Sequence, residues 1–115
     1  MAISEAYSGT ETVTTTEWSL TGDDNSLAAI TTDGIYQCFL DLNALAAGDL
    51  YVFRVYEKVL SGSTQRLVFS ATFGGAQGEP VWVSPSLILI HGWDMALLKL
   101  AGTDRAIDWS IRSIA

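Results

Sequence analysis

Hydrophobic and polar residues alternate along most of the chain with a period of two. In the segment 36–42, every second residue is hydrophobic, from Tyr36 to Leu42. Successive side chains of a β-strand point to opposite faces of its sheet, so this alternation is typical of a strand with one buried face. The pattern recurs in three further segments: 51–59, 65–73 and 107–112. It predicts antiparallel sheets, each with one face packed on a core.

The N-terminal segment differs because threonine replaces most of its hydrophobic residues. Five of the seven residues from Thr10 to Thr16 are threonine, a β-branched residue that favours strands. A strand that is polar on both faces is typical of a sheet edge or a surface arm. We therefore expect a strand over 10–20, and residues 1–20 as a Thr-rich arm or edge strand that pairs with another subunit. The interface candidates in this segment are Thr12, Thr14, Thr16 and Trp18.

Turn-forming residues separate the expected strands. Residues 61–64 (Ser-Gly-Ser-Thr) and 102–105 (Gly-Thr-Asp-Arg) have the composition of hairpin turns. Pro85 separates the hydrophobic segments 81–83 and 87–90, which favours an edge or a change of sheet there. About eight strands, with turns roughly every 8–12 residues, predict an antiparallel β-sandwich. Jelly-roll and immunoglobulin-like topologies both fit, and a small closed barrel is the third alternative.

Composition supports a single all-β domain over residues 1–115. The chain has 115 residues, of which 49% are hydrophobic, enough for one core and too few for two. Its first five residues lack the basic and apolar regions of a signal peptide, so we expect synthesis in a cytoplasm without export. No apolar segment approaches the length of a membrane-spanning helix.

Charge is distributed unevenly along the chain. The net charge is −7, which disfavours binding to nucleic acids and to anionic membranes. Residues 1–53 contain eight acidic residues and no Lys or Arg, whereas residues 54–115 contain five acidic and six basic residues. If the acidic segments also cluster in space, they form an acidic face that favours oriented packing on a larger assembly.

Few residues are candidates for catalysis. His91 is the only histidine, and no Gly-x-Ser-x-Gly sequence marks a nucleophile for it to activate, so a structural role is favoured. Cys38 alternates with hydrophobic residues, which predicts a buried core thiol. A pair of carboxylates for glycoside cleavage is the least favoured interpretation, because sequence spacing does not show which acids meet. The acids on or beside expected strands are Asp41, Asp49, Glu57, Asp94 and Asp108.

Calcium is the metal that the acidic residues fit best, because its ligands are oxygens. The candidate ligands form two groups, Asp23, Asp24 and Asn25 in one and Asp41, Asn43 and Asp49 in the other. Neither group has the spacing of an Asp-x-Asp-x-Asp-Gly loop. Asp and Asn also bond to their own backbone in tight bends, so turn formation is preferred. We assign no metal, cofactor or catalytic residue.

The chain has four tryptophans, which raises the question of a sugar-binding surface. Trp109 alternates with isoleucines and is expected in the core. Trp82 lies between Val81 and Val83, so either the tryptophan or the two valines face outward. We take Trp82 as the best candidate for an exposed aromatic residue, in a protein interface or beneath a sugar, with Trp93 as a second candidate.

Several segments carry a family resemblance. They are Phe39–Asn43, Gly48–Asp49, Val52–Lys58, Gly92–Asp94, Leu97, Ala101–Arg105 and Asp108–Arg112. In these residues the chain resembles small β-sandwich virion proteins of tailed bacteriophages, over residues 35–115. The resemblance implies a virion structural role, such as a capsid decoration protein or a head or tail accessory protein.

The resemblance leads to one preferred function and one alternative. We expect a non-enzymatic virion subunit, made in the host cytoplasm, that binds the major capsid or tail protein and forms a homo-oligomer. No nucleic-acid or membrane partner is expected. The alternative is a carbohydrate-binding module for adsorption, which uses exposed tryptophan.

Overall fold

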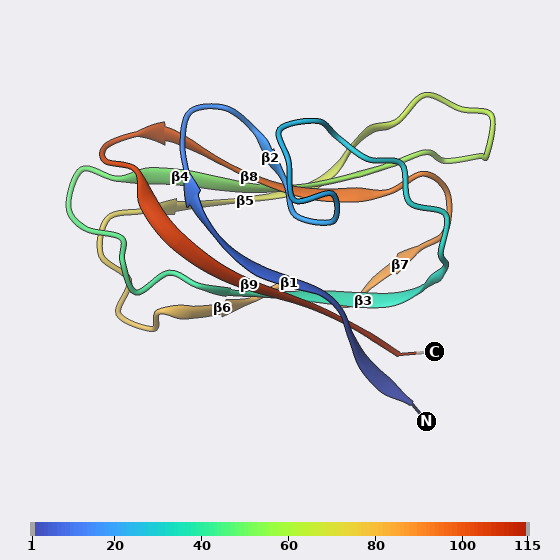
Figure 1. Ribbon diagram of the computed structural model, residues 1–115, viewed down its shortest axis with the longest axis horizontal. Helices are drawn as coiled ribbons and strands as arrows, with labels where there is room; N and C mark the ends of the chain where they lie inside the picture. The colour runs from blue at the N-terminus through green and yellow to red at the C-terminus, as the bar shows by residue number, and fades with distance from the viewer. Residues whose placement is uncertain (1, 115) are drawn as a thin grey trace.

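The computed structural model describes residues 2–114, which form nine β-strands joined by turns and loops (Figure 1). The strands are β1 (Ile3–Val13), β2 (Trp18–Ser19), β3 (Gly34–Asp41), β4 (Leu50–Glu57), β5 (Arg66–Gly74), β6 (Val81–Val83), β7 (Leu87–Leu89), β8 (Asp94–Ala101) and β9 (Arg105–Ile114). Residues 1 and 115 of the expected domain lie outside the described residues. Within the described part, no helix is long and apolar enough to cross a membrane.

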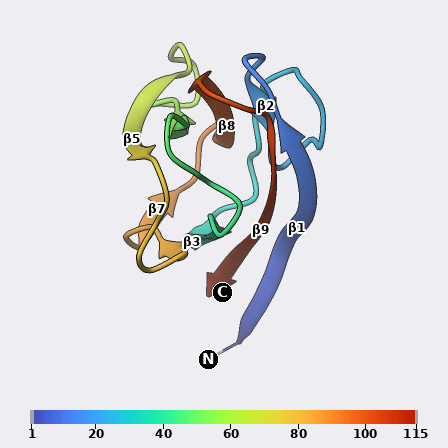
Figure 2. The ribbon, with the colours of Figure 1, turned by 90° about the vertical axis from the view of Figure 1, so that its left-hand side faces the viewer.

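The strands form two antiparallel sheets that pack face to face (Figure 2). Sheet A has the order β1-β9-β3-β6, and β7 pairs with the same edge of β3 beyond β6. Sheet B has the order β2-β8-β4-β5. With β6 and β7 sharing one position, this is the strand order of a jelly roll. The sandwich prediction is confirmed, and the order selects the jelly roll over the immunoglobulin-like alternative.

Alternation along the strands builds the core between the sheets. The inward residues of β3, β4 and β9, all 4% exposed or less, are Tyr36, Cys38, Leu40, Tyr51, Phe53, Val55, Ile107, Trp109 and Ile111. This confirms the predicted inner faces of these strands. The prediction is wrong for Val59, which is 82% exposed because β4 ends at Glu57 and the chain leaves the sheet. It is also wrong for Leu67, which is 50% exposed near the start of β5.

The N-terminal segment contains two strands in different sheets, so the expectation of one strand over 10–20 is wrong. β1 ends at Val13, whose buried side chain holds this end of the strand in the core. The backbone N–H of Lys99 then donates to the carbonyl oxygen of Thr14, which draws the chain toward sheet B. β2 begins at Trp18 and pairs with β8. β1 itself lies at an edge of sheet A.

The two sheets differ in how their outer faces are covered. Asp94 and Ala96 of β8 alternate with the inward residues Met95 and Leu97, yet all four are buried. The segment 20–30 passes over this side of β8 (Figure 1). The backbone N–H of Ala28 donates to Asp94 of β8, and Ile30 forms an isolated bridge with Trp93, just before β8. The outer face of sheet A over β9 and β3 carries several exposed hydrophobic side chains.

Candidate functional site

Four isoleucine side chains form a row across four strands on the outer face of sheet A. Strand register places Ile3 opposite Ile114, Ile114 opposite Ile35, and Ile35 opposite Ile88. Their exposed fractions, in the order Ile3, Ile114, Ile35 and Ile88, are 70%, 38%, 40% and 79%. Single exposed apolar residues are ordinary on protein surfaces, whereas a contiguous group marks a site of interaction. We call this group the isoleucine row.

A groove of about 250 Å³ lies beside the isoleucine row. Its walls include Ile3, Ile35 and Ile114, and its polar groups include Gln37 and Arg112. Gln37 and Arg112 are themselves neighbours across β3 and β9. The groove therefore combines an apolar end with a cationic group on adjacent strands.

Arg112 is held in place by its neighbours. Its guanidinium lies over the ring of Phe39, 3.8 Å from the ring centroid, which is the geometry of a cation–π contact. Its Nε donates to Ser110 Oγ at 3.2 Å, and the Ser110 hydroxyl donates to the Glu5 carboxylate. The hydrogen bond from Ser110 and, secondly, one with Ser8 lower the pKa of Glu5, so Glu5 is charged at neutral pH.

The structure brings four of the five predicted interface residues together. Thr12, Thr14, Thr16 and Trp18 line one recess between β1 and β2, with a volume of about 230 Å³. Glu11 and Asn25 complete it. Thr14 also shapes the crossing between the sheets, because its Oγ1 accepts from the backbone N–H of Thr16 at 3.2 Å. We call this the threonine recess.

The fifth candidate, Trp82, is not the exposed aromatic residue that the sequence analysis expects. Its ring packs against Phe53 and Phe73, with ring centroids 5.3 and 5.0 Å apart. Val81 and Val83 are the residues of β6 that face outward and are exposed. The Trp82 ring gains aromatic contacts inside the core, and this packing decides which side of β6 faces inward.

Trp93, the second candidate for an exposed tryptophan, is completely buried, and its indole N–H donates to the carbonyl oxygen of Thr32. Cys38 is buried as predicted, and burial raises the pKa of its thiol well above the usual range. His91 lies in the turn before β8, where its backbone N–H donates to the Glu57 carboxylate. The surroundings of Trp93, Cys38 and His91 are therefore those of residues with a structural role.

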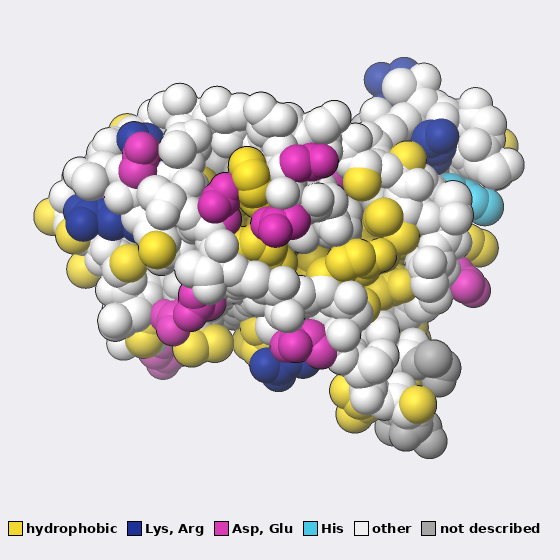
Figure 3. Space-filling model, viewed as in Figure 1, with side chains coloured by type: hydrophobic (Ala, Val, Ile, Leu, Met, Phe, Trp, Pro, Cys, Tyr) yellow, Lys and Arg dark blue, Asp and Glu magenta, His cyan; other side chains and the backbone are white. Residues whose placement is uncertain are grey.

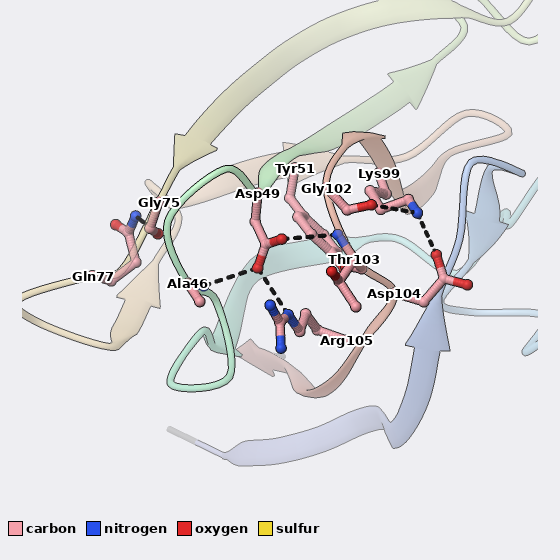
Figure 4. Close-up of polar contacts among 10 residues, drawn as sticks. All are labelled: Ala46, Asp49, Tyr51, Gly75, Gln77, Lys99, Gly102, Thr103, Asp104 and Arg105. Carbon is pink, nitrogen blue, oxygen red and sulfur yellow. Dashed lines mark hydrogen bonds and ion pairs between the residues drawn. The ribbon is translucent and has the colours of Figure 1, made fainter.

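Asp49 joins the turn before β4 to the turn between β8 and β9 (Figure 4). Its Oδ1 accepts from the backbone N–H of Thr103 at 2.9 Å, and its Oδ2 accepts from the N–H of Ala46 and from Arg105 Nε, both at 2.8 Å. These contacts, with the Thr103 and Ala46 hydrogen bonds foremost, lower the pKa of Asp49 from 3.8 to about 2. Asp49 is therefore a charged link between two turns.

Other acidic residues also bond to the backbone. The Asp24 and Asp41 carboxylates accept from the N–H groups of Ser26 and Asn43, two residues further on, the geometry of an Asx turn. Among residues 2–114, no group of three or more His, Cys, Asp or Glu side chains is placed to hold a metal. The positions of Asp24 and Asp41 agree with the turn interpretation.

Acidic side chains are prominent on the face of the molecule that Figure 3 shows. Figure 3 shows Asp and Glu side chains clustered in the middle of the view, over β1 and the chain around β2, and Lys and Arg mostly at its ends.

The comparisons with known proteins yield remote structural neighbours. No family model and no curated protein matches the sequence. The chain is similar in structure to Eiger TNF from S. frugiperda, with a TM-score of 0.44 and 14% identity, over 76% of this chain and 63% of that one. It is also similar to the xylan-binding domain from CBM 22, with a TM-score of 0.42 and 14% identity, over 86% of this chain and 64% of that one. The chain spans less than two thirds of either neighbour, and similarity at this level assigns no function.

The isoleucine row is the feature that the sequence analysis misses. Ile3 lies in the expected N-terminal arm but before the strand expected over 10–20, and Ile35 precedes the expected strand over 36–42. Ile88 belongs to a short apolar run that alternation does not orient. Only the register between β1, β9, β3 and β7 aligns these residues, and register depends on pairing between distant segments.

Proposed function

We propose that the protein is a structural subunit of a tailed-bacteriophage virion that docks through the outer face of sheet A. The observation that carries this proposal is the isoleucine row, four exposed side chains aligned across four strands. The partner is the major capsid or tail protein, and the role is capsid decoration or a head or tail accessory function. The resemblance over residues 35–115 gives the class of particle.

The chemistry of the acidic residues supports a structural role. Asp49 and Asp94 are buried, and their oxygens accept hydrogen bonds from backbone N–H groups and from Ser, Thr or Arg side chains. Glu57 accepts from the N–H groups of Ile90 and His91. Carboxylates that are satisfied in this way stabilise turns and loops. The jelly-roll fold is also found in viral capsid proteins, which is an analogy of fold alone.

Particle binding tests this proposal. Particles are purified from the phage source that encodes the chain, stripped of the protein and incubated with purified variants. The wild-type chain should rebind, and the double variant Ile35→Lys with Ile88→Lys should bind at least about tenfold more weakly, because two charges replace buried apolar contacts. The matched control, Val59→Lys, changes a highly exposed residue in the turn after β4 of sheet B and should bind normally. Absence of the protein from the particles, or normal binding by the double variant, would refute the proposal.

A second candidate function is carbohydrate binding, and the threonine recess is the observation that favours it. The recess combines the Trp18 indole with the side chains of Glu11 and Asn25 and with hydroxyl groups. Neutral oligosaccharides present apolar faces and hydroxyls to such groups. Titration of labelled protein with a panel of oligosaccharides should then shift NMR signals of residues 11–18 and 25, and Asn25→Ala should weaken the effect. Unchanged spectra would reject this candidate.

A further inference from the structure

We propose that the groove beside the isoleucine row binds an extended peptide segment of the partner protein in which an Asp or Glu lies two residues from an aliphatic residue. The inference rests on the proposed function, because it names the chemistry of the partner that docks on this face. Arg112 recognises the carboxylate, and the isoleucine row receives the aliphatic side chain.

Two of the other three arginines of the described chain have their guanidinium groups in ion pairs. Arg54 pairs with Glu17, and Arg105 pairs with Asp49. Arg112 forms no ion pair within residues 2–114, and its only hydrogen bond there runs from Nε to Ser110. The terminal amino groups of its guanidinium are thus uncommitted, although the group itself is held against Phe39.

An oriented guanidinium with uncommitted terminal amino groups is suited to a carboxylate. Two parallel N–H donors of arginine match the two oxygens of a carboxylate, and such bidentate pairs are stronger than neutral hydrogen bonds. The apolar walls of the groove exclude water when the site is filled, which strengthens the charge interaction. The Phe39 contact fixes the guanidinium plane before binding, so less side-chain entropy is lost.

The spacing of the site matches an extended peptide. Arg112 and Ile114 are two residues apart on β9 and line the same groove. Along a strand this separation is about 6.6 Å, and side chains two residues apart in any extended segment have the same separation and the same direction. A segment that runs along β9 therefore places its acidic residue over Arg112 when its aliphatic residue lies over the isoleucine row.

Glu5 lies next to Arg112 and weakens the attraction of this site for a carboxylate. It lies opposite Arg112 in the register of β1 and β9, and its carboxylate is held by Ser110. Its negative charge opposes an incoming carboxylate. The proposal therefore predicts opposite effects for the two neighbours, weaker binding without the charge of Arg112 and tighter binding without the charge of Glu5.

NMR titration of the labelled full chain with the peptide acetyl-Ile-Ser-Asp-Ser-Ile-amide tests the inference. We expect shifts at residues 35–39 and 110–114, and binding at least about tenfold tighter than for the same peptide with Asn in place of Asp. Arg112→Gln should abolish this preference, and Glu5→Gln should strengthen it. The control Arg66→Gln, at an exposed position of β5, should behave like the wild type. Thermal unfolding confirms that each variant is folded.

Three results would overturn the inference: equal binding of the Asp and Asn peptides, an unchanged preference in Arg112→Gln, or decanoate binding as tightly as the peptide.

The particle assay separates this inference from the proposed function. Normal rebinding of Arg112→Gln to particles, with no peptide binding, refutes the inference and leaves the virion role in place. Peptide binding by a chain that is absent from particles refutes the virion role and leaves the site in place.

Discussion

Gly9 positions the edge strand β1 because it has no side chain. A Cβ atom at this position would lie 2.8 Å from Cζ2 of Trp109, whose indole occupies the space beneath β1. β1 can approach β9 over this large ring only if residue 9 is glycine. The position of β1, which contributes Ile3 to the docking face, therefore depends on the close approach of Gly9 to Trp109.

Substitution of Gly9 by Ala should destabilise the fold by about 1–3 kcal/mol, the usual cost of overpacking in a core. Urea unfolding followed by tryptophan fluorescence measures the effect. Gly62→Ala is the matched control, because a Cβ at Gly62 meets nothing within 4 Å. Equal stability of the two variants would contradict the packing role assigned to Gly9.

Asp49 should give stability a specific dependence on pH. Its pKa is lowered from 3.8 to about 2 in the folded chain, chiefly by the Thr103 and Ala46 N–H groups. A group with a depressed folded pKa stabilises the fold above its unfolded pKa, and this stability is lost as the pH falls through the folded value. The free energy of unfolding should therefore fall between about pH 4 and pH 2, and Asp49→Asn should be less stable at pH 7 with a flatter profile in that range. A parallel profile for the variant would show that other acids cause the fall.

At the scale of the elements, Asp94 fixes the segment that covers sheet B. Its Oδ2 accepts from the Ser19 hydroxyl at 2.7 Å and from the Ala28 N–H at 2.8 Å, and its Oδ1 accepts from the Thr21 hydroxyl at 2.6 Å. These bonds hold the start and the end of the segment 19–28 on β8. The segment therefore covers β8 of sheet B, whereas the isoleucine row on the outer face of sheet A is exposed.

Replacement of Asp94 by Ala should cost about 3 kcal/mol, because several donors lose a buried charged acceptor. Limited proteolysis should also cut within residues 20–28 earlier than in the wild type. Asp104→Ala removes an acid whose ion pair with Lys99 is partly exposed, and it should change stability by less than about 1 kcal/mol. Similar losses in the two variants would contradict the anchoring role of Asp94.

The sequence predicts those elements whose local pattern determines their environment. Alternation identifies the inner faces of β3 and β9, because each residue there is either inside or outside a single core. It fails at β6, where Trp82 and the two valines are all apolar and only the packing of Trp82 on Phe53 decides between them. It also fails at the end of β1, since the change of sheet after Val13 depends on a distant partner, Lys99.

The candidate site is less predictable than the fold for the same reason. Thr12, Thr14, Thr16 and Trp18 were close enough in sequence for their composition to draw attention, and they do line one recess. The isoleucine row combines residues from four strands, and the contact of Arg112 with Phe39 joins β9 to β3. Such groupings come from register and topology, which a single sequence specifies only weakly.

At the scale of the whole molecule, charged and hydrophobic side chains meet on the outer face of sheet A. In the view of Figure 3, Asp and Glu side chains lie over β1 and the chain around β2, and the isoleucine row crosses the same sheet, where Glu5 lies opposite Arg112. The net charge of −7 opposes unspecific association of the subunits, whereas the apolar row supplies a local attraction. Charged groups placed beside an apolar row favour one orientation of docking over many.

Hydroxyl-radical footprinting of the free and the particle-bound protein tests the docking face most directly. In the bound protein, Ile3, Ile35, Phe39 and Ile88 should lose most of their reactivity, because docking buries them. Val59 and Leu60, exposed at the β4–β5 turn, should react equally in both states. Unchanged reactivity of the isoleucine row, together with protection of Val59 and Leu60, would contradict the account.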